Sequence, residues 1–150
     1  MVQIDNPRKQ FQFNIIIPGL NPFLAQTAKL PDIDFDVTEH GDVGYMVKTA
    51  GLARLGKFTV EKIVDSMGND QFIWDWARQI FNFMGKSRQI PSAYKRMGLV
   101  EQYGNDGLVV VKNWPLIGIW PSKINGTEFS RTSSENTIES IEFECDEVQY

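Results

Sequence analysis

Residues 30–38 read Leu-Pro-Asp-Ile-Asp-Phe-Asp-Val-Thr and carry the sharpest pattern in the chain. Large apolar side chains alternate there with carboxylates: Ile33, Phe35 and Val37 with Asp32, Asp34 and Asp36. Successive side chains of a β-strand point to opposite faces, so this pattern predicts a strand with an acidic face and an apolar face. The glycine-containing residues 39–44 that follow predict a break in the strand.

Similar alternation recurs outward from this stretch. It predicts strands over residues 10–18, 57–64, 94–103, 108–114 and 137–148, with a weaker extended pattern over 45–52. The turn Gly104-Asn105-Asp106-Gly107 joins two of these strands as a hairpin. Residues 115–121 contain two prolines and predict an apolar corner.

One segment has the period of a helix instead. Its apolar stripe consists of Phe72, Ile73, Trp76, Ala77, Ile80, Phe81 and Met84. Asn69 and Asp70 predict the N-cap, and Gly85 predicts the end. Together these patterns predict one domain over residues 1–150, mainly β (α+β): an antiparallel β-barrel or sandwich with one flanking amphipathic helix.

Composition limits the classes of function. The chain has 150 residues, of which 42% are hydrophobic and 23% charged, which is typical of a globular protein. Its net charge of −4 counts against a protein that grips nucleic-acid phosphates. A single cysteine excludes an intrachain disulfide, and a single histidine argues against a zinc site. The sequence contains no apolar run of about 18 residues, so it predicts no membrane-spanning segment.

Three motifs suggest chemistry and fail on inspection. Residues 51–57 approach a phosphate-binding loop, but Phe58 stands where a hydroxyl is needed and a strand follows instead of a helix. Glu39, His40 and Asp42 lack a second histidine for a metal site, so we expect an exposed loop histidine. Cys145 reads as a buried small hydrophobe and not as the partner of His40 in a nucleophilic pair. We therefore expect no enzyme activity, no cofactor and no metal.

The acidic row of Asp32, Asp34 and Asp36 leaves two interpretations open. It does not suit a calcium loop, and catalytic carboxylates usually come from different elements. Either the row is the solvated face of a strand, or it is a functional surface where negative charge is wanted, because like charges on one face repel one another.

The second half of the chain carries an ordered set of motifs. They are Pro91-Ser92-Ala93-Tyr94-Lys95-Arg96, Val100-Glu101-Gln102-Tyr103, Gly104-Asn105-Asp106-Gly107, Gly118-Ile119-Trp120-Pro121, Asn136-Thr137-Ile138 and Asp146. Their order and spacing resemble the tail tube proteins of contractile-tailed bacteriophages. A looser set agrees in the first half: Leu30-Pro31, Gly51, Thr59-Val60, Asn69-Asp70 and a helix with a central Trp. The sequence departs from that pattern at Gly51-Leu52, where the family has Gly-Asp.

This resemblance implies a structural protein of the virion that is assembled in the host cytoplasm. Its subunits would form homohexameric rings that stack helically into the inner tube of a contractile tail, a passive conduit for ejection of the genome. The implied partners are further copies of the chain, the tail sheath protein, the baseplate initiator and the tail terminator. Tape measure protein and genome DNA would occupy the lumen without sequence-specific binding, and no membrane is implied.

Three groups of residues receive roles as hypotheses. Asp32, Asp34 and Asp36 would face the lumen and repel DNA phosphates. Glu39, His40, Gly41, Asp42 and Val43 would reach the next ring. Asp75, Arg78, Gln79, Asn82 and Lys86 would lie on the outer face of the helix, toward the sheath.

Two other interpretations remain. The tube could belong to an R-type bacteriocin or another contractile injection system that passes ions or protein effectors. Alternatively, the chain could be a non-polymerising β binding module. The apolar faces of residues 108–111 and 117–120 distinguish a tube subunit from a monomeric binding module. A monomer must bury these faces internally, whereas a tube subunit can leave part of them for a neighbour.

Overall fold

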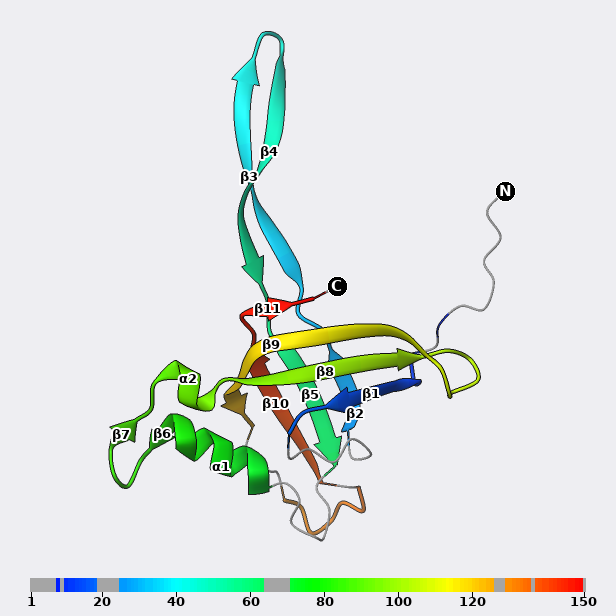
Figure 1. Cartoon of the computed structure of the whole chain (residues 1–150), viewed down its shortest axis with the longest axis vertical. Helices are drawn as coiled ribbons and strands as arrows, with labels where there is room; N and C mark the ends of the chain where they lie inside the picture. The colour runs from blue at the N-terminus through cyan, green and yellow to red at the C-terminus, as the bar shows by residue number, and fades with distance from the viewer. Residues whose placement is uncertain are drawn as a thin grey trace.

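The computed structural model describes Arg8 and residues 10–18, 25–63, 71–125, 129–135 and 137–149. Asp42 and Ile63 are described by their backbone alone. The predicted N-cap of Asn69 and Asp70 lies outside the described residues, as does Asn136. Figure 1 shows a body of crossed strands with a helix at one side and a long hairpin rising from it.

Within the described residues, the body is built on a seven-stranded sheet in which neighbouring strands pair antiparallel. In sheet order its strands are β1 (Phe13–Ile16), β8 (Arg96–Tyr103), β9 (Val110–Ile124), β10 (Ile138–Glu144), β5 (Phe58–Ile63) and β2 (Ala25–Lys29), while β11 (Glu147–Val148) pairs with β9. The predicted mainly-β class is confirmed. The sheet is sandwich-like and not closed, because β1 and β2 stand at its two ends.

Strand β9 connects the two halves of the sheet, β1 and β8 on one side and β10, β5 and β2 on the other. Its first part pairs with β8 and its last part with β10, so one continuous strand runs through the predicted corner at residues 115–121. That prediction is wrong because both prolines are tolerated in the strand. The carbonyl of Pro115 accepts a hydrogen bond from Gln149 just past the end of β11, and Pro121 lies opposite Phe143 at a register shift.

The described part of the chain has two helices, α1 (Gln71–Ile80) and the short α2 (Pro91–Tyr94). Neither has the length and apolar character needed to cross a membrane. The predicted continuation of α1 to Gly85 is wrong. After Ile80 the chain forms a small hairpin of β6 (Phe81–Asn82) and β7 (Ser87–Arg88). The side-chain oxygen of Asn82 accepts hydrogen bonds from the N–H groups of Met84 and Gly85, which offers the backbone an alternative to the helix.

The predicted alternation correctly identifies much of the core. Phe58 and Val60 of β5 face Ile141 and Phe143 of β10, and all four are buried. Trp76 of α1 covers this cluster, its ring centroid 5.8 Å from that of Phe143. The predicted final strand is two strands, because Cys145 and Asp146 interrupt it between β10 and β11. Strand β2 was not predicted.

A buried ion pair closes one end of the β5–β10 ladder. The Nζ atom of Lys62 lies 3.3 Å from an Oε atom of Glu139, and both side chains are essentially inaccessible to solvent. The two residues are direct cross-strand neighbours, on the same face as Val60 and Ile141. Two opposite charges thus occupy positions that the strand period would assign to apolar residues.

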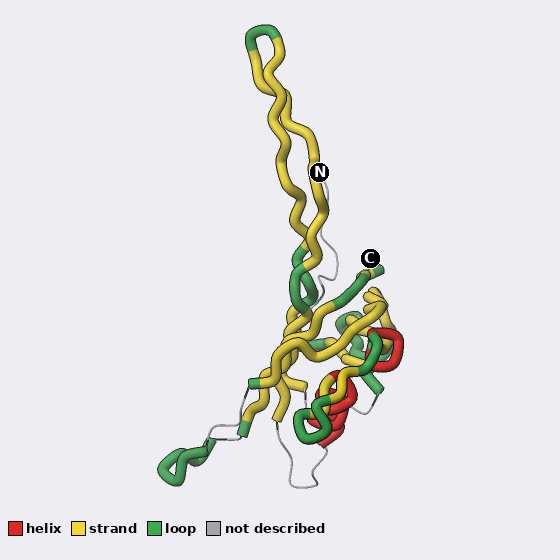
Figure 2. Tube along the Cα trace, turned by 90° about the vertical axis from the view of Figure 1, so that its left-hand side faces the viewer, coloured by secondary structure: helices red, strands yellow, loops and turns green. Residues whose placement is uncertain are grey.

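The long hairpin consists of β3 (Ile33–Asp42) and β4 (Tyr45–Leu55), which within the described residues pair only with each other. Figure 2 shows it projecting far from the body. The predicted strand and extended segment are confirmed, but the predicted break at residues 39–44 is wrong. Pairing continues to Asp42 opposite Tyr45, and only Val43 and Gly44 form the turn. Gly44 has a φ of 82°, which glycine adopts without steric cost.

Candidate assembly surfaces

The hairpin β3–β4 has two chemically different faces. Ile33, Phe35 and Val37 share one face, paired across the ladder with Leu55, Ala53 and Ala50. Asp34 and Asp36 lie on the other face, near Arg54. The predicted division into an apolar and an acidic face is therefore confirmed within β3, while Asp32 precedes the strand.

The acidic row is partly neutralised by neighbouring cations. Arg54 Nη2 lies 3.2 Å from a carboxylate oxygen of Asp36, and Lys29 Nζ lies 3.4 Å from one of Asp32. Asp34 is the direct cross-strand partner of Arg54. All these side chains are exposed, so each pair contributes little to stability, but together they lower the net charge of the row to about one negative unit.

The apolar face of the hairpin is uncovered. Phe35 is 58% exposed and Val37 is 64% exposed, and Ile33 is also exposed. A two-stranded hairpin with an apolar face is marginal in water unless something packs on that face. The surface is therefore a candidate contact for another protein subunit.

Gly51 allows the hairpin to bend at its middle. The register of β3 and β4 shifts between Phe35 and Val37, where β4 carries an extra residue. A Cβ atom on Gly51 would come within 3.0 Å of the Asp36 carbonyl oxygen. This close approach explains why a glycine stands in the motif-like segment 51–57, which forms the end of β4 and the link to β5 instead of a phosphate loop.

The predicted stacking residues form the far end of the hairpin. Glu39 pairs with Lys48 at 3.8 Å, and His40 is exposed opposite Val47. Glu39 and His40 are adjacent in a strand and point to opposite faces, so they do not converge on a metal ion. Within the described ranges, no group of three or more potential ligands is close enough to hold one.

The predicted outer face of α1 is only partly helical. Asp75, Arg78 and Gln79 are exposed on the helix, with Arg78 Nη1 3.6 Å from Asp75. Gln79 accepts a hydrogen bond from Arg96 at 2.9 Å. Asn82 and Lys86 were wrongly placed on the helix: Asn82 belongs to β6 and Lys86 to the turn before β7, because the chain leaves the helix after Ile80.

Several motifs of the second half meet at one joint. Lys95 Nζ bonds both carboxylate oxygens of Asp146, at 2.8 and 2.9 Å, and Asp146 N–H donates to the carbonyl of Ile117. The Asp146 carboxylate packs directly on Gly118, where a Cβ atom would overlap it. Tyr94 and Trp120 stack edge to face nearby, with ring centroids 5.9 Å apart. Motifs that are far apart in the sequence therefore meet here in one structural junction.

Cys145 is half-buried beside this joint, less buried than the sequence predicts. Desolvation, and then the charges of Glu144 and Asp146, raise the pKa of its thiol to about 11. His40 lies near the far end of the hairpin, whereas Cys145 lies in the body, so the two do not form a nucleophilic pair.

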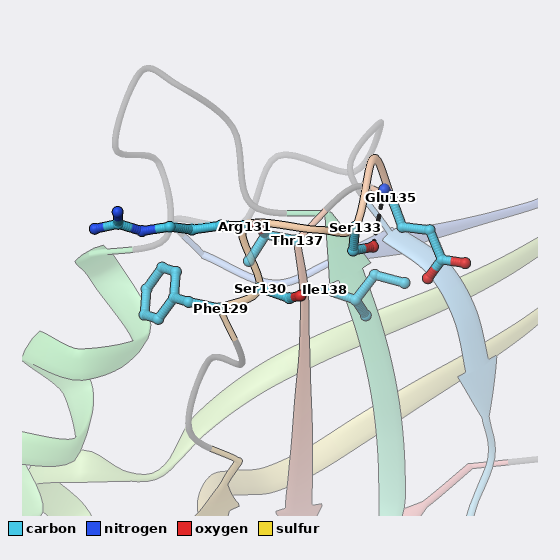
Figure 3. Close-up of a pocket in the computed structure, with 7 residues that line it drawn as sticks. All are labelled: Phe129, Ser130, Arg131, Ser133, Glu135, Thr137 and Ile138. Carbon is cyan, nitrogen blue, oxygen red and sulfur yellow. Dashed lines mark hydrogen bonds between the residues drawn. The ribbon is translucent and has the colours of Figure 1, made fainter.

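An open cavity of about 910 Å³ lies beside the loop before β10 (Figure 3). It is lined by Phe129, Ser130, Arg131, Ser133, Glu135, Thr137 and Ile138. The Ser130 hydroxyl lies 3.1 Å from that of Thr132, and Ser133 Oγ accepts the N–H of Glu135. These contacts shape the loop, and neither joins a nucleophile to a base.

The apolar segments 108–111 and 117–120, which distinguish a tube subunit from a monomer, are partly exposed. Leu108 is 83% exposed, and Val109, Val110 and Val111 are also exposed, whereas Ile119 is buried. The protein leaves part of this surface unburied, as expected of a subunit that contacts a neighbour.

Comparison with known protein families identifies the family of the chain. Residues 9–149 match the family of the T4-like virus tail tube protein gp19. The chain therefore belongs to this tail tube family and is a structural component of a contractile tail assembly. No curated protein sequence matches it.

Solved structures share the fold. The cap that terminates the tube of the anti-feeding prophage has 21% identity and a TM-score of 0.79, over 99% of this chain and 93% of that one. The sheath/tube terminator of an extracellular contractile injection system (PVC) has 20% identity and a TM-score of 0.78, over 98% of each chain. A chain in the extended sheath–tube complex of the same system has 20% identity and a TM-score of 0.75, over 97% of this chain and 92% of that one.

Proposed function

We propose that the chain is a single tail-tube domain whose copies form hexameric rings, stacked helically into the inner tube of a contractile tail. The observation that carries this proposal is the projecting hairpin β3–β4, whose apolar face is exposed in the single subunit. Family membership supports a tube, and stacking would give that face a partner.

The open sheet supports closure into a ring. Strands β1 and β2 stand at its two ends, and a cavity of about 650 Å³ lies between them, lined by residues that include Phe11, Phe13 and Trp114. An uncovered strand edge invites pairing with another chain. A ring in which each subunit meets the next would protect both edges without a free end.

The hairpin end, from Glu39 to Val43, would reach the neighbouring ring. Its length favours an axial contact, because the hairpin projects well beyond the body (Figure 2). The apolar face with Phe35 and Val37 would supply most of the contact energy, and the Glu39–Lys48 pair would lie at its edge.

We infer that Asp32, Asp34 and Asp36 line the lumen of the tube. With Lys29 and Arg54 beside them, they leave a weakly negative wall that DNA phosphates would not bind. Replacing all three by lysine is expected to leave tubes intact and to impair ejection by the assembled particle. Lysine at exposed Glu135 serves as the control, and normal ejection by the triple variant would contradict this assignment.

The exposed face of α1 with Asp75, Arg78 and Gln79, followed by Asn82 and Lys86, would face the sheath. Solvated polar contacts of this kind are weak and break easily during contraction. The baseplate initiator and tail terminator would bind the two ends of the tube. Tape measure protein and then genome DNA would occupy the lumen, and the tube would form in the host cytoplasm as part of the virion.

A second candidate keeps the tube and changes the cargo. The similar structures come from the anti-feeding prophage and an extracellular contractile injection system. A tube of this kind, or of an R-type bacteriocin, would pass protein effectors or ions in place of DNA. Capsid and portal genes beside the gene for this chain would favour the phage.

Negative-stain electron microscopy over a concentration series tests the assembly. Rings or tubes with a stain-filled central hole are expected. A strict monomer at every concentration, also in the presence of preformed tube ends, would contradict the proposal and favour a non-polymerising binding module.

A further inference from the structure

The ladder between β5 and β10 attaches the long hairpin to the rest of the subunit. Within the described residues, β2 pairs only with β5, while β3 and β4 pair only with each other. This ladder is therefore the strand pairing that joins residues 25–63, hairpin included, to the part of the sheet that contains β9, β8 and β1. Figure 1 shows β5 running into the body below the base of the hairpin. The register of β5 on β10 thus sets where the hairpin stands relative to the body.

The apolar pairs of this ladder do not select one register. On the buried face Phe58 lies opposite Phe143, and Val60 lies opposite Ile141. A shift by two residues keeps every side chain on its own face of the sheet. It would bring Val60 opposite Phe143, or Phe58 opposite Ile141, so apolar groups would still meet apolar groups.

The exposed face of the ladder does not select a register either. Lys57 Nζ lies 3.5 Å from a carboxylate oxygen of Glu142 and 4.0 Å from one of Glu144, so this cation already contacts two successive positions on that face of β10. Exposed ion pairs of this kind contribute little free energy.

The buried ion pair does select a register. Lys62 Nζ lies 3.3 Å from an Oε atom of Glu139, and the two side chains are 1% and 0% exposed. Among the described residues Lys62 Nζ has no hydrogen-bond acceptor, so its charge depends on this carboxylate. A shift by two residues would place Lys62 opposite Ile141, or Glu139 opposite Val60. Either arrangement separates the charges and leaves a buried charge against an apolar side chain, which is far more costly than repacking.

We propose that Lys62 and Glu139 fix the register of β5 on β10 and thereby the position of the hairpin relative to the body. The register is a property of the single subunit, and only its consequence for stacking rests on the tube proposed above. A shift by two residues would move the base of the hairpin by about 7 Å along the strand. The apolar face of the hairpin would then miss a contact in the next ring that is built for the native position.

Disulfide formation reports the register directly. In a Cys145→Ala background, Thr59→Cys with Glu142→Cys joins direct partners of the native register. Thr59→Cys with Ser140→Cys, or with Glu144→Cys, joins partners of a register shifted by two residues one way or the other. Each cysteine pair is placed in chains with the native ion pair and in chains with Lys62→Met and Glu139→Leu. The refolded proteins are oxidised at low concentration, and mass spectrometry measures the initial rate of intrachain disulfide formation.

With the native ion pair, only the native-register disulfide should form readily, because diagonal partners lie about 7–8 Å apart, beyond the reach of a disulfide. With the apolar pair, at least one shifted disulfide should form at least about tenfold faster than it does with the native pair. The exchanged pair, Lys62→Glu with Glu139→Lys, is the matched control and should keep the native register. Shifted disulfides that stay equally slow with the apolar pair would overturn the proposal.

Two further measurements complete the test. Urea unfolding shows which variants fold, and Lys62→Leu with Glu139→Met is a second apolar pair. If neither apolar pair folds while the exchanged pair does, the ion pair acts on stability and its role in the register is overturned. In the electron microscope, chains with a loosened register should give shorter tubes, and normal tubes would overturn the link to the hairpin. Absence of tubes from the unmodified chain as well would contradict the tube and leave the register result standing.

Discussion

Gly118 shows how a single residue fixes the junction of the second-half motifs. It has a φ of 68°, and the Asp146 carboxylate, held by Lys95, occupies the place of its missing Cβ atom. A side chain here would meet both backbone strain and overlap. The junction between β9 and β11 therefore depends on a glycine and on one buttressing ion pair.

Replacing Gly118 with alanine should destabilise the protein by about 3 kcal/mol, more than backbone strain alone. Gly107 is the matched control: it has a φ of 71°, and a Cβ atom there has only an ordinary contact, 3.8 Å from Gln12. Gly107→Ala should cost about 1 kcal/mol. Urea unfolding measures both, and equal costs would show that the Asp146 contact does not matter.

The buried pair of Lys62 and Glu139 gives a second residue-scale prediction. Removing one charge, as in Lys62→Met or Glu139→Leu, leaves the other buried without its ionic partner and should cost about 3–5 kcal/mol. The double replacement should recover most of this loss, since an apolar pair avoids the desolvation cost. Urea unfolding of all four proteins gives the coupling energy, and additive losses would contradict the argument.

Cys145 gives a pH-dependent prediction. Its pKa is raised to about 11 from an ordinary value of 9.0, so the folded state holds the proton more tightly than the unfolded state. The resulting stability is complete below about pH 9 and is lost as the pH rises to about 11. At pH 8, iodoacetamide should alkylate the native thiol about a hundredfold more slowly than the urea-unfolded one. Equal rates would show an unshifted thiol.

At the scale of elements, the apolar face of the hairpin β3–β4 matters for contacts between subunits and not for the folding of one subunit. Its apolar face contributes little to the monomer because nothing in the described part of the body covers it. The pairing of Ile33 with Leu55 anchors its base, and Gly56 N–H donates to the Asp32 carbonyl at 2.7 Å. These contacts hold β3 and β4 together where the hairpin leaves the body.

Phe35→Ser combined with Val37→Ser should change the free energy of unfolding of the monomer by less than about 1 kcal/mol, because both side chains are exposed. The same variant should lose stacking, so single rings or free subunits replace tubes in the electron microscope. Thr38→Ser with Thr49→Ser, on the opposite face, is the control. Tubes of normal length in the apolar-face variant would assign that face to another role.

At the scale of the whole molecule, assembly should add stability to a subunit that leaves many apolar side chains uncovered. Exposed apolar groups gather on the hairpin β3–β4, on the turn between β6 and β7 (Phe83 and Met84) and on the turn between β8 and β9 (Leu108 and Val109). A partner that binds only the folded state stabilises it by an amount that rises with the logarithm of the partner's concentration. The thermal midpoint should thus rise with protein concentration across the threshold for ring formation, as calorimetry measures. A constant midpoint in samples that contain rings would contradict this coupling.

The sequence by itself determined the class and most of the inner faces. Period-two alternation correctly places Phe58, Val60, Ile141 and Phe143 in the core, because that pattern depends only on strand geometry. The ordered motifs of the second half are sufficient to recognise the family. The sequence also identified the apolar and the acidic face of β3, although it did not identify what would cover them.

Only the tertiary structure decided where elements end and which groups meet. Asn82 ends α1 early because its side-chain oxygen accepts hydrogen bonds from the N–H groups of Met84 and Gly85. Strand β9 passes two prolines because neighbouring strands end or shift there. Arg54 approaches Asp36 across the hairpin β3–β4, and Lys95 approaches Asp146 from a distant part of the chain. Local patterns report the period of a segment, whereas these contacts depend on which strands lie side by side, and that is fixed by burial over the whole chain.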